Sequence, residues 1–473
     1  SATGNEGQKS YAVTGSMVSP YLIDITDLRN QRILSPTVSV TSLKFTLELT
    51  SASGREFALV NASAMAKPFS IAATQIDDIR STANAADLII VTHDNFYSQA
   101  LDFAAYRQSR DGIRVRVVKV SDVYAQFSGG MVDPIAIRDF LRYAFGNWSG
   151  AKPSFCLLAG DGVYDLRNNL RTNAVSYIPP FIVENDSTIS DENYCYFGQL
   201  FDLDSDNSDP ADRGVDMVIA RWPVKTVAEF QTVAEKIKSY DTGSNAGTWR
   251  NLITLIADDQ NHPSSGPEIG HTIDSETLAR GSIPGKFDLD KIYGIEYPYG
   301  SAGEKPEMRE AIVRSINSGT LLVNYIGHGN PNVWADEHVF RRLQDIPRLT
   351  NSDRLPLIFN ASCSIGFFDD PVSEGMAEDF LRYAGGGAVG TVSATRQVFS
   401  RPNADFNQQA FTQLFGGKNY TIAEAVFVAK LLRQGSGGTD DNDRKYIYIG
   451  DPLTRLAVAP LKIDFTGDLP RQG

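Results

Sequence analysis

The spacing of hydrophobic residues changes near residue 85 of this 473-residue chain. Before that point apolar and polar residues alternate, as in Leu43-Lys-Phe-Thr-Leu-Glu-Leu and Glu56-Phe-Ala-Leu-Val, and Ser, Gly and Pro interrupt the runs. A period of two is typical of strands in an antiparallel sheet with one buried face. We therefore expect residues 1–80 to form a partial β-sandwich module.

Beyond residue 85 the pattern is a short apolar run followed by a helical segment, repeated many times. One round includes the apolar runs Asp87–Thr92 and Phe155–Ala159, and a second round begins at Leu252–Ala257. Alternation of this kind predicts an α/β fold, in which parallel strands are covered by helices on both faces. Such sheets bind ligands at the carboxyl ends of their strands.

The chain is too long for one hydrophobic core, since single cores stop growing at about 250–300 residues. The polar stretch Asp241-Thr-Gly-Ser-Asn-Ala-Gly separates the two rounds. We therefore expect two sub-domains of one α/β unit, at residues 81–245 and 246–457, with the second holding the active site. A further β module is expected to begin at residues 458–473.

Composition narrows the class of protein. The net charge of −13 argues against nucleic acid as a partner, and no apolar stretch approaches the ~20 residues that span a bilayer. Cys156, Cys195 and Cys363 are the only cysteines, an odd number that leaves at least one thiol free. The chain begins at Ser1 without a signal peptide, so we interpret it as a processed piece of a longer protein.

Two turns of small residues follow apolar runs in the second round, and each holds one reactive side chain. They are Tyr325-Ile-Gly-His328-Gly329 and Phe359-Asn-Ala-Ser-Cys363-Ser. The separation of 35 positions from His328 to Cys363 fits one strand, a connection with a helix at Glu337–Leu349, and the next strand. Adjacent parallel strands lie about 5 Å apart, so the imidazole and the thiol are predicted to meet.

A cysteine nucleophile needs this pair. His328 takes the proton of the Cys363 thiol and later gives it to the leaving amine. The backbone N–H of Gly329 is open to a developing oxyanion. The alternative is a buried structural cysteine and a capping histidine, which is the better interpretation of either residue alone. The two residues together, each after an apolar strand and each beside Gly or Ser, favour the catalytic interpretation.

Other candidate sites rest on weaker patterns. Asp202, Asp204 and Asp206 have the spacing of a calcium loop, but Ser208 and Arg213 depart from the EF-hand template, so a solvated acidic turn is slightly favoured over a calcium site. No His or Cys cluster has the spacing of a zinc site. His271, His93 and His338 are interpreted as surface residues, and Trp334 as a substrate-pocket wall or a core anchor.

The segments around His328 and Cys363 resemble the active-site motifs of the gingipain-type cysteine peptidases, which have a caspase-like fold. The resemblance covers roughly residues 85–457. Within this family, the sortases of the type IX secretion system are the most similar group. The supporting segments are Asp87-Leu-Ile-Ile-Val-Thr-His93, Arg110-Asp-Gly-Ile-Arg-Val, Leu157-Leu-Ala-Gly-Asp161-Gly and Gly450-Asp-Pro-Leu. The Gly-Asp-Gly and Gly-Asp-Pro turns are weak motifs by themselves.

The resemblance implies a cysteine endopeptidase or transpeptidase on the extracellular face of the outer membrane of a Gram-negative bacterium. Such sortases remove the C-terminal secretion signal of exported proteins and pass the acyl group to a lipopolysaccharide amine. The resemblance also implies an outer-membrane β-barrel partner. The thioester mechanism requires no cofactor, although related peptidases bind structural calcium.

The resemblance also assigns roles to single residues. The N–H groups of Cys363 and Gly329 would form the oxyanion hole. Asp258 stands where relatives carry the acid that orients the histidine, with a helix cap or solvated acid as the alternative. Glu268 stands where arginine-cutting relatives bind the substrate cation, although Gln260–Gly266 departs from their loop.

Two other functions remain as alternatives. One is a secreted, gingipain-like degradative peptidase. The other is a catalytically silent scaffold with a peptidase fold, which the presence of both Cys363 and His328 argues against.

Overall fold

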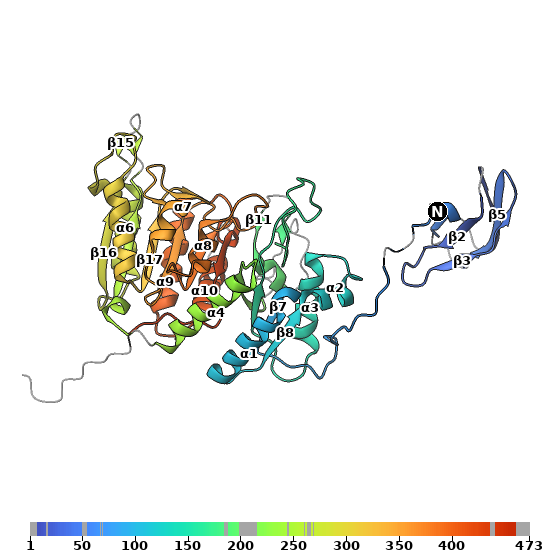
Figure 1. Cartoon of the computed structure of the whole chain (residues 1–473), viewed down its shortest axis with the longest axis horizontal. Helices are drawn as coiled ribbons and strands as arrows, with labels where there is room; N and C mark the ends of the chain where they lie inside the picture. The colour runs from blue at the N-terminus through green and yellow to red at the C-terminus, as the bar shows by residue number, and fades with distance from the viewer. Residues whose placement is uncertain are drawn as a thin grey trace, which may run out of the picture. The chain divides into compact units, whose positions relative to one another are not determined.

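The computed structural model consists of two compact units, Ser1–Gln75 and Ile76–Gly473 (Figure 1). The structure describes residues 7–15, 18–49, 54–66, 68, 70–183, 188–197, 215–243, 246–259, 261–262, 266–267, 269–435 and 440–459. The predicted calcium loop with Asp202, Asp204 and Asp206 lies outside the described residues, and so do Glu268 and nearly all of the segment 458–473.

The first unit contains two small antiparallel sheets, as the alternating pattern predicts. One has the order β1-β5-β4 and the other β3-β2-β6. Among its described residues the buried hydrophobic side chains are Leu22, Leu43 and Leu47, and the Phe45 ring stacks on Tyr11. The strands are β1 (Gly7–Thr14), β2 (Pro20–Asp24), β3 (Arg32–Leu34), β4 (Thr37–Val38), β5 (Ser42–Leu49) and β6 (Phe57–Asn61).

The second unit is built on one ten-stranded sheet to which both predicted sub-domains contribute. All neighbouring strands run parallel except β22 and β23, which are antiparallel. In spatial order the strands are β16 (Asp288–Tyr293), β13 (Leu252–Ala257), β17 (Leu322–Ile326), β21 (Leu357–Ala361), β22 (Gly390–Ala394), β23 (Tyr446–Ile449), β12 (Val218–Trp222), β9 (Phe155–Ala159), β7 (Leu88–Thr92) and β8 (Val115–Lys119).

Among the described residues, seven shorter strands lie in the connections. They are β10 (Ile182–Val183), β11 (Thr188–Ile189), β14 (Asn261–His262), β15 (Gly266–Pro267), β18 (Gly329–Asn330), β19 (Val333–Trp334) and β20 (Phe340–Arg341). Of these, β18, β19 and β20 form a small sheet directly after the His328 turn.

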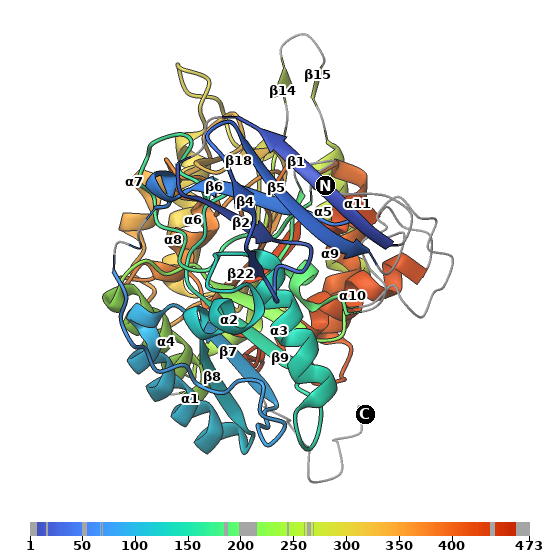
Figure 2. The same cartoon turned by 90° about the vertical axis from the view of Figure 1, so that its right-hand side faces the viewer.

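Helices cover both faces of the sheet because successive residues of its strands point to opposite sides. In β7, Leu88 and Ile90 join one apolar cluster, while Ile89 and Val91 join the other. Helices α2 (Val120–Phe127) and α3 (Pro134–Asn147) pack on the second face (Figure 2). The helices are α1 (Tyr97–Asp111), α2 (Val120–Phe127), α3 (Pro134–Asn147), α4 (Val227–Thr242), α5 (Gly270–Gly281), α6 (Pro306–Ser318), α7 (Arg342–Asp345), α8 (Met376–Arg382), α9 (Ser400–Phe415), α10 (Ile422–Gly435) and α11 (Asp440–Arg444).

Local sequence sets several helix boundaries. Pro306 is the first residue of α6, where its fixed φ suits a helix start and its missing N–H costs nothing. Thr226 and Glu229 form a capping box at the start of α4. The helix expected between the His and Cys strands is shorter than predicted, because α7 has only four residues and a 3₁₀ turn at Ile346–Arg348 follows it.

A buried ion pair links β12 to the segments beside it. Arg221 is fully buried, and its Nε and Nη2 donate to the two carboxylate oxygens of Asp191 at 2.7 Å each. Its remaining N–H groups donate to the carbonyls of Gly160, Ile178 and Pro179 at 2.9–3.2 Å. A planar guanidinium can satisfy all five acceptors at once, whereas an ammonium cannot.

We predict that Arg221→Lys lowers the free energy of unfolding by at least about 3 kcal/mol, because several buried acceptors lose their donors. Urea unfolding of the purified protein measures this. Arg280→Lys is the matched control, since the Arg280 side chain is 81% exposed and its change should cost less than about 0.5 kcal/mol. Equal stabilities of the two variants would contradict the role given to Arg221.

Candidate active site

His328 and Cys363 follow two neighbouring parallel strands at the same edge of the sheet. Strands β17 and β21 pair in register, with Ile326 opposite Ala361 as the last pair. His328 and Cys363 each stand two residues beyond that pair. The strands themselves are fully buried, whereas both reactive side chains are partly exposed. The topology thus delivers the imidazole and the thiol to one edge, as the sequence predicts.

Two glycines allow the segments of this edge to approach closely. A Cβ on Gly327 would lie 2.2 Å from the Asp258 Cβ, and a Cβ on Gly329 would lie 2.6 Å from the Ser362 Oγ. Any side chain at either position would push its neighbour away. Close packing therefore requires glycine on both sides of His328. The absence of side chains there lets the Asp258 and Cys363 segments lie close to the His328 turn.

Asp258 lies directly after β13, the other neighbour of β17. It is only 2% exposed, and its Oδ2 accepts a hydrogen bond from the backbone N–H of His328 at 3.0 Å. Burial raises the pKa of Asp258 to about 6, against the opposing effects of this hydrogen bond and the His328 charge. The acid is buried against His328 rather than solvated, and its hydrogen bond is to the backbone of the histidine.

His271 is a neighbour of His328 that the sequence interpretation placed at the surface. It lies in the first turn of α5 and is 3% exposed. Its ring meets the His328 ring edge-on, with centroids 5.4 Å apart. The order of elements could have placed His271 near the site. Helix α5 is the first helix after β13, so its N-terminal turn lies near the carboxyl edge of the sheet.

The Cys363 thiol lies against the segment that follows β22. Its Sγ is 3.3 Å from the carbonyl oxygen of Val398 and accepts the Val398 N–H at 3.5 Å. The next residue, Ser364, has a φ of 54°, a strained conformation for a non-glycine residue that is often found at functional sites.

Cys156 and Cys195, in contrast, are buried thiols. Both are fully buried in the apolar cluster on one face of the sheet. Burial raises the pKa of both thiols well above the ordinary range, so neither forms a thiolate readily. Of the three cysteines, Cys363 alone is partly exposed.

Trp334 is a core residue. It is fully buried, its ring stacks on Tyr325 at 4.6 Å with an angle of 9°, and Phe340 and Phe380 pack around it. Of the two interpretations of Trp334, the structure therefore favours the core anchor over the substrate-pocket wall. Gly329, the expected oxyanion residue, lies in β18 and pairs with Trp334 in β19, which attaches the His328 turn to this aromatic core.

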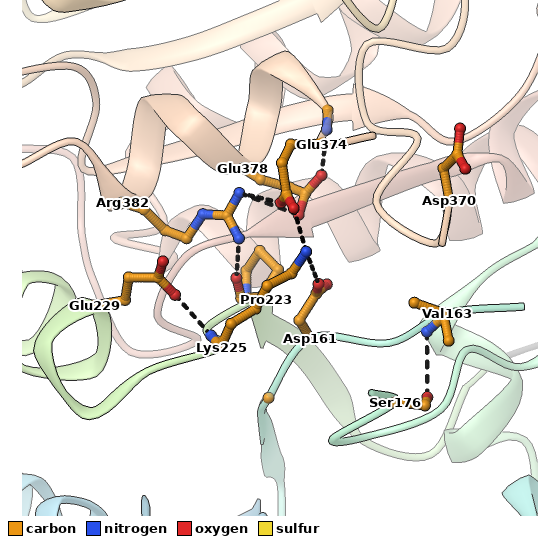
Figure 3. Close-up of polar contacts among 12 residues, drawn as sticks. Asp161, Val163, Ser176, Pro223, Lys225, Glu229, Asp370, Glu374, Glu378 and Arg382 are labelled. Atoms are coloured by element: carbon orange, nitrogen blue, oxygen red, sulfur yellow. Dashed lines mark hydrogen bonds and ion pairs between the residues drawn. The ribbon is translucent and has the colours of Figure 1, made fainter. Parts of the chain in front are cut away.

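The loop after Cys363 is held by a cluster of charges, drawn in Figure 3. The loop leads into α8, whose Ala377 N–H donates to the carbonyl of Ile365 at 3.2 Å. Lys225 extends between Glu374 and Asp161, and its Nζ lies 3.1 Å from Asp161 Oδ2 (Figure 3). Arg382 pairs with Glu374 at 2.5 Å.

The pKa values of two carboxylates in this charge cluster are shifted in opposite directions. Burial alone would raise the pKa of Glu374, but the charge of Arg382 and the hydrogen bonds from Lys225 and Arg382 outweigh it and lower that pKa to about 2. Burial raises the pKa of Asp161 to about 6, with Lys225 and Arg382 opposing. The two cations therefore stabilise chiefly the ionised form of Glu374.

Sequence comparison identifies the family. Residues 81–457, the greater part of the chain, match the profile of peptidase family C25. The chain belongs to this family.

The C25 assignment agrees with individual relatives. Gingipain R2 of Porphyromonas gingivalis is 23% identical over 297 residues, which are 63% of this chain and 34% of the relative. Gingipain R1 of the same species is 23% identical over 282 residues, which are 59% of this chain and 24% of the relative. The chain thus spans about a third or less of the length of these curated relatives.

Solved structures show the same fold. The crystal structure of the Arg-specific cysteine proteinase gingipain R (RgpB) has a TM-score of 0.60 at 20% identity, covering 82% of this chain and 81% of that one. Dimeric latent PorU from Porphyromonas gingivalis has a TM-score of 0.53 at 16% identity, covering 96% of this chain and 38% of that one. The predicted gingipain-type, caspase-like α/β fold of a C25 cysteine peptidase is confirmed, and PorU has the same fold.

We predict that Glu374→Gln loses about 2 kcal/mol of stability at pH 7, a value reduced for partial exposure of the side chain. Because the folded pKa of Glu374 lies near 2 and its ordinary value is 4.5, this contribution is complete above about pH 4.5 and disappears as the pH falls toward 2. Urea unfolding at pH 7, 5, 4 and 3.5 measures the difference from wild type.

The exposed Glu307, in the first turn of α6, provides the control variant Glu307→Gln. Its unfolding free energy should stay within about 0.5 kcal/mol of wild type at every pH. A stability loss in Glu374→Gln that is the same at pH 7 and pH 3.5 would contradict the assigned ion pairs.

Proposed function

We propose that this C25 protein is a cysteine endopeptidase and transpeptidase of the type IX secretion system. It removes C-terminal secretion signals from exported proteins and passes the acyl group to water or to a lipopolysaccharide amine. The observation that carries the proposal is the register of β17 and β21, which ends both strands at one edge immediately before His328 and Cys363.

The mechanism uses three residues of the sheet edge. His328 accepts the thiol proton, the Cys363 sulfur attacks the peptide carbonyl, and the N–H groups of Cys363 and Gly329 stabilise the oxyanion. His328 then protonates the leaving amine, and the C–N bond breaks to leave a thioester on Cys363. Water or an amine, deprotonated by His328, attacks the thioester and releases the thiol. Asp258 holds the His328 backbone in place.

The extent of the fold supports a sortase over a degradative peptidase. The likeness to PorU covers 96% of this chain. The remaining 4% of the chain is too short to contain the whole 75-residue first unit, so at least part of that unit is covered. The likeness to gingipain R covers 82%. A β unit ahead of the peptidase unit thus belongs to the part shared with PorU, which makes the sortase the preferred function.

Location and partners belong to the same proposal. We place the protein on the extracellular face of the outer membrane, held by an outer-membrane β-barrel partner and acting on proteins with C-terminal secretion signals. Within the described residues, no helix has the length and apolarity to cross a bilayer. A structural calcium ion at Asp202, Asp204 and Asp206, and a substrate cation at Glu268, remain predictions from the sequence.

Activity provides the first test. Purified wild type should cleave a cargo protein that carries a type IX C-terminal signal, and Cys363→Ala should lower kcat/KM by at least ~10³-fold, because the nucleophile is lost. Cys156→Ala is the matched control: it removes a buried thiol and should retain cleavage. Equal cleavage by wild type and Cys363→Ala would refute the cysteine peptidase mechanism for this protein.

Thiol reactivity tests the His328–Cys363 pair without a substrate. At pH 7 iodoacetamide should label Cys363 at least ~10-fold faster than Cys156 or Cys195, which are buried. His328→Ala should slow the labelling of Cys363, because the imidazolium no longer stabilises the thiolate. The control is the exposed His338, whose replacement by Ala should leave the rate unchanged. Peptide mass spectrometry measures each site; equal rates in wild type and His328→Ala would support the silent-scaffold alternative.

A further inference from the structure

Three potential metal ligands from separate segments converge beside the sheet edge. They are Asp258 after β13, His271 in the first turn of α5 and His328 after β17. One carboxylate oxygen and one ring nitrogen from each histidine lie within 4.8 Å of one another. The three residues are 13 and 57 positions apart along the chain, so no sequence spacing reveals the group.

The surrounding structure holds these three residues close together. Strands β13 and β17 pair in register up to Ala257 and Ile326, which fixes the starting points of Asp258 and His328. Asp258 also accepts the His328 N–H at 3.0 Å, and the His271 ring lies edge-on against the His328 ring. Asp258 and His271 are buried, and His328 is partly exposed, so an ion would reach the site from the His328 side.

Two imidazoles and one carboxylate are ligands typical of zinc and of similar divalent transition metals, whereas calcium and magnesium prefer oxygen alone. A tetrahedral zinc ion with bonds of about 2.0–2.1 Å holds its ligand atoms ~3.4 Å apart. The three ligand atoms, all within 4.8 Å of one another, approach that spacing. Three protein ligands leave a fourth position for water or an incoming group.

The other three-residue clusters of carboxylates near one another already pair with lysine or arginine side chains. Lys225 and Arg382 pair with the carboxylates around Asp161. Lys305 Nζ donates to both oxygens of Asp259 at 2.6 Å. Among the described residues, the group of Asp258, His271 and His328 is the one that combines a carboxylate with two imidazoles.

We propose that Asp258, His271 and His328 form a binding site for a zinc-class divalent transition-metal ion, and that the bound ion silences the peptidase. A ring nitrogen of His328 that donates its lone pair to a metal has no lone pair for the Cys363 proton. Metal binding would thus keep the thiol protonated and hold the enzyme inactive until the ion is removed. The proposed inhibition of the peptidase rests on the function proposed above, whereas the proposed binding of the metal ion does not.

Metal binding is tested first, in the untagged Cys363→Ala protein, where neither activity nor the thiol can interfere. Zn²⁺ is titrated in competition with a chromophoric chelator. One equivalent is expected, and the affinity should fall at least ~100-fold when His271→Gln is added to Cys363→Ala. Adding His338→Gln instead is the matched control, since His338 is exposed and should not affect binding.

His271 is buried, so thermal melting must first show that the His271→Gln protein is folded. The partly exposed His328 gives a second variant, His328→Gln, which should lose zinc to the same degree. Binding of Co²⁺ should give the visible bands of a tetrahedral site in Cys363→Ala and weak ones in His328→Gln. The site is refuted if the folded Cys363→Ala protein binds no equivalent of Zn²⁺, or if His328→Gln binds as tightly as its parent.

Inhibition is tested separately in the wild-type enzyme with a type IX cargo substrate. Half-maximal inhibition is expected at the Zn²⁺ concentration that half-saturates Cys363→Ala, and a chelator should restore the full rate. Inhibition at a concentration more than ~10-fold different would overturn the silencing, because another site would then be responsible. Failure of the proposed peptidase function would appear as lack of cleavage in metal-free buffer, while the binding result with Cys363→Ala would still decide the metal site.

Discussion

The pairing of β17 with β13 on one side and with β21 on the other is the constraint on which the site depends. Parallel strands in register end together, so Ala257, Ile326 and Ala361 lie in one row at the carboxyl edge of the sheet. The functional side chains come one or two residues later. Their mutual positions are therefore fixed by backbone hydrogen bonds between strands that are buried where they end, rather than by mobile loops.

Packing behind this row makes the constraint rigid. Gly327 and Gly329 admit the Asp258 and Ser362 side chains at distances that no other residue would permit. Trp334 and Tyr325 stack beneath the His328 turn, and the charges of Lys225 and Arg382 hold the start of α8 below the Cys363 loop. The Gly-Asp-Gly and Gly-Asp-Pro turns are also held to other segments by ion pairs. Asp161 pairs with Lys225, and Asp451 accepts a hydrogen bond from Arg107 Nη2 at 2.5 Å.

The sequence predicts much of this, because buried parallel strands are continuous apolar runs and reactive residues at their carboxyl ends share an edge. The α/β class and the placement of His328 and Cys363 follow from that reasoning, whereas the β-sheets of the first unit follow from the alternation of apolar and polar residues. It does not reveal the strand order, in which the antiparallel β23 joins both halves into one sheet. It also misplaces His271, because a residue in the first turn of a helix is set by the connection before it, and periodicity carries no information about that connection.

The central claim is that the Cys363 sulfur and a ring nitrogen of His328 act on one carbonyl. A crystal structure of the protein with a substrate-like peptide aldehyde tests it most directly. We expect a hemithioacetal on Cys363, a His328 nitrogen within ~4 Å of the sulfur or the new oxygen, and that oxygen facing the N–H groups of Cys363 and Gly329. A peptide that binds elsewhere, or a thiol and an imidazole that point into separate cavities in the complex, would contradict it.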